Sequence, residues 1–106
     1  MLNALVATAA LYLADYPGVG MPVIRFAETP GDWGHTRCGR VCYVTLNEEF
    51  SDIPAARLTL LHELGHVVDH HQNGGVFSRQ PHGRNWRRIV RAWGLSGRTG
   101  HPQPPF

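Results

Sequence analysis

The chain has 106 residues, which suits one small domain. Apolar residues make up 42% and charged residues 17%, with a formal net charge of +2, so the composition is globular and argues against general disorder. No apolar run reaches the roughly 18 residues that a membrane-spanning helix needs, and two cysteines are too few for a disulfide scaffold or a four-cysteine zinc site.

The first segment predicts a helix. Its apolar residues recur at helical spacing on one face: Leu2, Leu5, Val6, Ala9, Leu13 and Tyr16. Pro17-Gly18 then ends the helix. The stretch Leu2–Ala14 resembles the core of a signal peptide, but no basic residue precedes it, so we expect a helix in a cytoplasmic protein.

Three extended segments follow. Pro22–Ala27 predicts a short strand, and the turn residues Pro30-Gly31-Asp32 lead to a second extended segment at Trp33–Thr36. Arg40–Leu46 is rich in β-branched and aromatic residues, which predicts a third strand.

Two further helices complete the predicted order. Ser51 or Asp52 can cap a helix that runs to about His71, where Asn73-Gly74-Gly75 stops it. A last helix is expected from about His82 to Trp93. We therefore expect an α+β fold, with one domain over residues 1–95 and a flexible Gly- and Pro-rich tail over residues 96–106.

The longest predicted helix carries the motif His62-Glu63-Leu64-Gly65-His66, an HExxH sequence. Positions i and i+4 lie one above the other on a helix, so the two imidazoles can bind one metal ion and Glu63 can act as general base toward an activated water. Apolar residues lie nearly opposite the histidines on the same helix: Leu60, Leu61, Leu64, Val67 and Val68. This pattern predicts a metal-binding face separated from a core face.

A catalytic zinc site needs a third protein ligand and leaves its fourth position to water. No glutamate follows Glu63, which excludes a downstream glutamate ligand. An extended HExxHxxGxxH motif would have glycine and histidine where this chain has Asp69 and Gln72. We expect Asp69 to be a supporting or surface group.

The remaining histidines narrow the choice of third ligand. His70 and His71 lie roughly 12–13 Å beyond His62 along the helix axis, too far to share its metal. That leaves His82, which follows a glycine-containing loop, and His101 in the tail. We favour His82.

The segment around His82 carries a family resemblance. HExxH followed by a short loop and by Pro81-His82-Gly83-Arg84-Asn85-Trp86 resembles the SprT-like zinc metallopeptidases, the family that includes the Spartan DNA–protein crosslink proteases. The strand that ends in Thr45-Leu46-Asn47 is also similar to that family, and the resemblance covers roughly residues 22–94.

The resemblance implies a zincin-like fold and hydrolysis of peptide bonds, on proteins associated with DNA in some members. It implies that His62, His66 and His82 bind Zn²⁺ and that Glu63 is the catalytic base. It also suggests Arg40–Leu46, or a neighbouring strand, as the sheet edge to which a substrate strand adds.

Other interpretations stay open. Many family members carry a C-terminal zinc ribbon of four cysteines, which this sequence lacks, so a role at DNA is less secure than the metal site. Residues 57–66 also resemble the ImmA/IrrE family of repressor-cleaving metalloproteins, but the glutamate-containing segment usual there is missing. A catalytically silent, zinc-stapled module that binds nucleic acid or protein, and a metal-free structural protein, are the alternatives from other classes.

The last predicted helix is basic on one side. All eight acidic residues lie in residues 1–69, whereas residues 70–106 contain six of the ten arginines and no acidic residue. Four arginines share one face of the helix: Arg84, Arg87, Arg88 and Arg91. The apolar residues share the other: Trp86, Ile89, Val90 and Trp93. The basic face is a candidate for contacts to nucleic-acid phosphates, with a solubilising surface as the alternative.

Cys38 and Cys42 are separated by three residues. They could close a small loop or hold a second metal with His35, but we expect a pair of reduced thiols near a hairpin.

Overall fold

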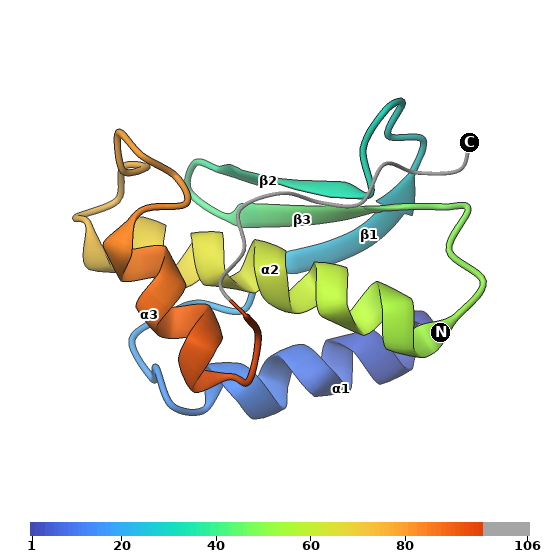
Figure 1. The fold of residues 1–106 in the computed structure, drawn as a ribbon, viewed down its shortest axis with the longest axis horizontal. Helices are drawn as coiled ribbons and strands as arrows, with labels where there is room; N and C mark the ends of the chain where they lie inside the picture. The colour runs from blue at the N-terminus through green and yellow to red at the C-terminus, as the bar shows by residue number, and fades with distance from the viewer. Residues whose placement is uncertain (97–106) are drawn as a thin grey trace.

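The computed structural model describes residues 1–96 (Figure 1). Its helices and strands are α1 (Leu2–Leu13), β1 (Val23–Ala27), β2 (Gly34–Cys38), β3 (Cys42–Asn47), α2 (Ile53–Gln72) and α3 (Arg84–Ala92). The predicted α+β class, with an N-terminal helix, a three-stranded sheet, a long HExxH helix and a C-terminal helix, is confirmed. In this part of the chain no helix has the length and apolar character to cross a membrane. The expected tail, apart from Ser96, lies outside the described residues.

The sheet is mixed, with the strand order β1-β3-β2. β3 pairs in parallel with β1, opposing Val44 to Ile24, and antiparallel with β2, opposing Val44 to Thr36. The predicted strand Arg40–Leu46 is therefore the central strand, shortened at its start to Cys42, and its neighbour β2 is an edge strand of the described sheet. Four successive buried residues from Val44 to Asn47 fit this central position.

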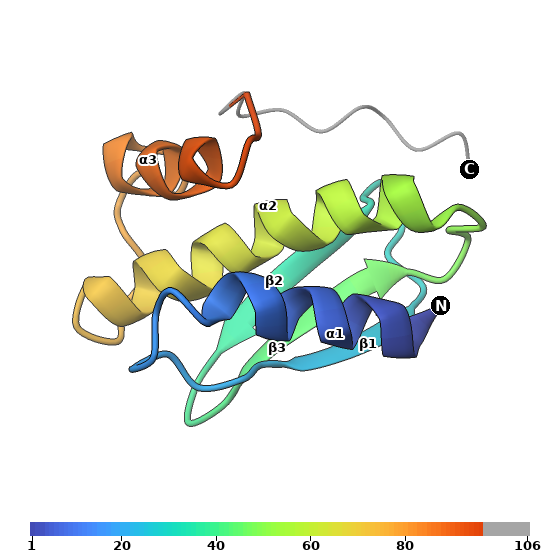
Figure 2. The same cartoon turned by 90° about the horizontal axis from the view of Figure 1, so that it is seen from below.

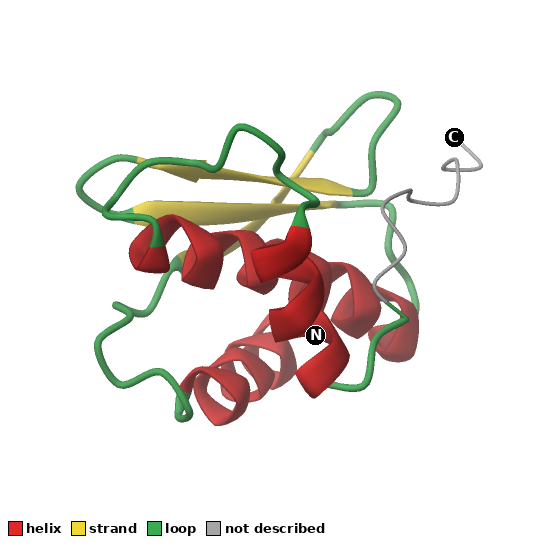
Figure 3. Ribbon diagram, turned by 60° about the vertical axis from the view of Figure 1, so that its left-hand side comes forward, coloured by secondary structure: helices red, strands yellow, loops and turns green. Residues whose placement is uncertain are grey.

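The helices lie on one face of the sheet (Figure 3). α1 and α2 run side by side beneath it, with α1 against β1 and α2 against β2 and β3, while α3 packs on α2 (Figure 2). The core lies between these layers, and its largest fully buried apolar side chains include Trp86, Leu5, Leu46, Leu60 and Leu64.

α2 is the most enclosed helix. Its apolar residues lie in the core, whereas His62, Glu63 and His66 line a cavity, so the predicted separation of the histidine face from the core face is confirmed, although both faces are buried. Every residue from Thr59 to Asp69 is buried, including His62 and His66, whose exposed fractions are only 7% and 8%. The sheet covers one side of α2, and Trp86 of α3 packs against both histidine rings on another. A polar motif can be buried there because its groups find partners inside the protein.

Two helix boundaries differ from the prediction. α1 ends at Leu13 and exposes Leu2 and Val6, so its buried stripe is narrower than the sequence suggests. α3 begins at Arg84, because Pro81-His82-Gly83 forms a turn in which the Gly83 amide donates to the Gln80 carbonyl oxygen at 2.9 Å. His82 thus lies in a loop, two residues before the helix.

The expectation of two reduced thiols is also wrong. The β2–β3 hairpin places Cys38 directly opposite Cys42, with 4.0 Å between their Cα atoms, and the two cysteines form a disulfide. The turn residues between them bring the sulfur atoms together, which spacing in the sequence did not reveal.

Candidate metal centre

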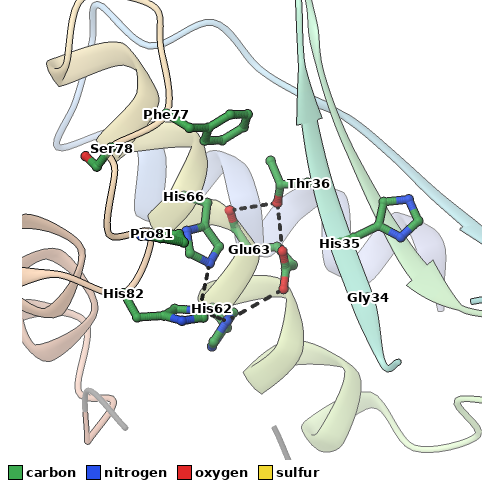
Figure 4. A pocket seen from close by; sticks show the side chains of 10 residues that line it. All are labelled: Gly34, His35, Thr36, His62, Glu63, His66, Phe77, Ser78, Pro81 and His82. Carbon is green, nitrogen blue, oxygen red and sulfur yellow. Dashed lines mark hydrogen bonds and ion pairs between the residues drawn. The ribbon is translucent and has the colours of Figure 1, made fainter. Parts of the chain in front are cut away.

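Three histidines converge on one point beside α2 (Figure 4). The Nε2 atom of His82 lies 3.1 Å from that of His62 and 3.2 Å from that of His66. His62 and His66 come from successive turns of α2, and half-buried His82 comes from the loop before α3.

The donor set fits a metal ion. At a zinc–nitrogen distance of about 2.0–2.1 Å, tetrahedral coordination places ligand nitrogens about 3.3 Å apart, close to the separations found here. Three imidazoles offer three lone pairs to one cation and leave a fourth position free. The histidines expected from the sequence are thus brought together, His101 lies outside the described residues, and the identity of the metal stays a prediction.

A helix end directs the chain back toward α2. Gly74 and Gly75 have φ values of 76° and 86°, which favour glycine. Their amides donate to the carbonyl oxygens of His71 and His70, a Schellman arrangement that closes the helix. Residues 73–83 then return along the helix, so His82 reaches the turn that carries His62.

Trp86 forms the floor of the histidine cluster. Its ring stacks on His66, at 5.4 Å between centroids and 18° between planes, and meets the rings of His62 and His82 edge-on at 4.7 Å. Its Nε1–H donates to the backbone carbonyl oxygen of His62 at 3.1 Å. Trp86, which the sequence placed on the apolar face of the last helix, is buried, with 1% exposed, and contacts all three rings.

Asp69 anchors the loop between α2 and α3 by hydrogen bonds. It is 2% exposed, and its two carboxylate oxygens accept hydrogen bonds of 2.8 Å from the Ser78 hydroxyl and the Asn85 side-chain amide. Asn85 also donates to Gln72 at 2.9 Å. Asp69 therefore connects α2, the loop that carries His82 and the start of α3, a supporting role that the sequence only partly indicated.

Glu63 lies beside the cluster and is held by β2. One carboxylate oxygen, Oε2, is 3.8 Å from His62 Nε2, and the other, Oε1, accepts a 2.8 Å hydrogen bond from the Thr36 hydroxyl. That hydroxyl is also 3.2 Å from the Glu63 backbone carbonyl oxygen. Sequence reasoning missed Thr36, because a single threonine in a short strand carries no motif.

An open cavity of about 350 Å³ gives access to these groups. One wall is the edge strand, with Gly34, His35 and Thr36, and the opposite wall is the loop, with Phe77 and Pro81 (Figure 4). The histidines and Glu63 lie between the walls. The site therefore combines a candidate metal-binding set, a carboxylate and an edge strand of the described sheet in one cleft.

The four arginines lie elsewhere on α3. Arg84, Arg87, Arg88 and Arg91 are exposed and line a groove of about 650 Å³ together with Gln80 and Gly83. Trp86, Ile89 and Val90 are buried on the opposite face, as the helical pattern predicts. Among residues 1–96, no arginine lines the histidine cavity, so the basic surface and the candidate metal centre are separate.

Comparison with known proteins agrees with this geometry. The model of the SprT-like family matches residues 17–102. No match was found among curated proteins or among solved structures. The match covers most of the chain and contains the HExxH motif and His82, so the family resemblance seen in the sequence is confirmed. The chain belongs to the SprT-like family, a family of metalloproteases.

Proposed function

We propose that this protein is a zinc-dependent metalloprotease that hydrolyses peptide bonds with Glu63 as general base. The observation that carries the proposal is the approach of three Nε2 atoms to one point, beside a buried carboxylate and inside an open cleft. His62, His66 and His82 would hold the ion. When bound, zinc supplies a Lewis acid that polarises a carbonyl group and acidifies water.

The side chain of Glu63 handles the proton. Glu63 directly follows His62 in α2 and lines the same cavity. Its carboxylate can therefore accept a proton from the attacking water and deliver it to the leaving amine. The Thr36 hydroxyl donates to Oε1 and thereby fixes the carboxylate orientation, leaving Oε2 toward the histidines.

The edge strand supports binding of an extended peptide. β2 pairs with β3 on one side only within the described sheet, and its residues from Gly34 to Thr36 form a wall of the cleft. A substrate segment that adds to this edge would gain backbone hydrogen bonds and would pass directly beside the histidines. We therefore assign substrate binding to β2, the neighbour of the strand first considered.

The Glu63→Gln variant tests the mechanism. It keeps the shape of the side chain but removes the base, so we expect zinc content to be unchanged and proteolysis of an unfolded protein substrate to fall about 10²- to 10⁴-fold. Glu49→Gln, at an exposed position, is the matched control and should retain full activity. Full proteolysis by zinc-loaded Glu63→Gln would rule the mechanism out and favour a different base.

A second candidate function is binding of single-stranded DNA by the arginine groove. It rests on four exposed arginines along one face of α3, whose charges can each contact a phosphate. Such binding would bring the protease to proteins associated with DNA. Alone, without cleavage, it would correspond to the silent binding module.

Salt dependence tests this candidate. Replacing Arg87 and Arg88 together with alanine should weaken binding and reduce the slope of log K against log salt by about 1.4, the value for two lost contacts to single-stranded DNA. The control replaces two other exposed arginines, Arg40 and Arg57, and carries the same net charge. Equal losses in both double variants would show that general charge, and not the groove, causes the attraction.

A further inference from the structure

A second group of metal-binding side chains lies outside the histidine cavity. The Sγ atoms of Cys38 and Cys42 and a ring nitrogen of His70 all lie within 4.8 Å of one another. The three residues come from the end of β2, the start of β3 and the last turns of α2, and all are half-buried. The histidine of this group is His70, and not the His35 considered from the sequence.

Metal ions and reductants can reach this group. A cavity of about 440 Å³ is lined by Cys42 and His70, together with the hairpin-turn residues Gly39, Arg40 and Val41. Within the described part of the chain, it shares no lining residue with the cavity that contains His62, Glu63 and His66. A ligand bound here would therefore be distinct from one in the candidate active site.

The disulfide is poorly explained as a structural link alone. Only three residues separate the cysteines, and the hairpin register already pairs Cys38 with Cys42. A covalent bond that closes so short a loop removes less entropy from the unfolded chain than one that closes a long loop. The nearby imidazole of His70 has no part in that link, but it completes a donor set of two sulfurs and one nitrogen, which suits zinc.

We propose that Cys38, Cys42 and His70 form a second, redox-controlled zinc site. A dithiol reductant transfers two electrons and two protons to the Cys38–Cys42 disulfide and is itself oxidised to a disulfide. The two thiols then lose two protons as they bind Zn²⁺, with His70 as third ligand and water as fourth. The separation of the sulfurs must rise to about 3.8 Å, the spacing at a tetrahedral zinc, which the short hairpin turn has to permit.

Charge is consistent with this assignment. Two thiolates and one Zn²⁺ form a neutral unit, and Arg37 and Arg40 line a second cavity together with Cys38 in the same hairpin. The oxidised protein cannot bind metal at this place, because both sulfurs are committed to the disulfide.

Cobalt(II) tests the proposal, because thiolate ligands give a near-ultraviolet charge-transfer band that a three-histidine site lacks. The full chain is reduced with a dithiol, freed of reductant without air, and titrated with Co²⁺. We expect about one more cobalt per chain than in the oxidised protein, together with the thiolate band. No additional cobalt and no band after reduction would overturn the proposal.

Variants assign the ligands. His70→Ala should weaken binding of the second cobalt at least about tenfold. His71→Ala should not, because His71 is exposed and lies outside the group of Cys38, Cys42 and His70. Equal affinity in both variants would remove His70 from the site. In His82→Ala the thiolate band should persist, so failure of the three-histidine site and failure of this one are distinguishable.

Discussion

Gly65 lies at the closest approach of α2 and α3. A methyl group added at its Cα would come within 2.6 Å of Val90 Cγ1 and 2.7 Å of Trp86 Nε1. Trp86 is the floor of the histidine cluster and is bonded to the His62 carbonyl, so it cannot move without disturbing the three rings. The glycine within the HExxH motif is therefore explained by packing and not by helix formation, for which alanine is better.

The Gly65→Ala variant measures this constraint. We expect the free energy of unfolding to fall by about 1–3 kcal/mol, since overpacking outweighs the gain in helix propensity. Zinc content should also fall. Chemical denaturation measures the free energy of unfolding, and metal analysis measures the zinc content. Gly20→Ala is the control, because nothing lies within 4 Å of its added methyl group and its φ is not positive. If the two variants were equally stable, the packing argument would be incorrect.

Among the elements, the loop between α2 and α3 positions His82 beside His62 and His66. Asp69 fixes this loop by accepting hydrogen bonds from Ser78 and Asn85, one on each side of His82. Both bonds go to a buried carboxylate and are therefore among the stronger hydrogen bonds of the protein.

The Asp69→Ala variant should loosen this connection. We expect zinc affinity to fall about tenfold or more, the usual effect of losing a group that orients a metal ligand, while His62 and His66 stay on α2. Competition with a chromophoric chelator measures the affinity, and far-ultraviolet circular dichroism checks that the helices persist. Glu48→Ala, at an exposed position, controls for removal of a carboxylate. Unchanged affinity in folded Asp69→Ala would mean that the loop holds its place without this residue.

On the scale of the whole molecule, a metal ion at the three histidines would link the loop before α3 to α2. A domain of this size buries only about two thirds of its unfolded surface, so a bound ion would contribute a large share of its stability. His82 in the loop and the two histidines of α2 would be held together by one ion.

Removal of the metal should therefore lower the thermal stability of the protein. At a free zinc concentration about 1,000 times the dissociation constant, binding stabilises the folded state by about 4 kcal/mol. Removal by a chelator should lower the Tm by roughly 15 °C or more, given about 4–8 °C per kcal/mol for a domain of this size. Scanning calorimetry with and without chelator measures this, and readdition of zinc should restore the Tm. An equal Tm with and without chelator would favour the alternative that the chain is a metal-free structural protein.

The order of helices and strands, the HExxH pair and the family were all predictable from the amino-acid sequence. Helical periodicity, turn residues and a motif at fixed spacing are local signals, so His62 and His66 needed no tertiary information. His82 followed from elimination and from the family resemblance. The buried and exposed faces of α3 were also readable from its periodicity.

Three features required the three-dimensional arrangement: which strand forms the edge, how deeply α2 is buried and which groups support the site. Features of this kind depend on contacts between different segments of the chain. They include the strand order, the Cys38–Cys42 disulfide of the hairpin, and the hydrogen bonds of Thr36 and Asp69. Periodicity describes one segment at a time. It cannot reveal that α3 packs on α2 and that Trp86 of α3 contacts the rings of all three histidines.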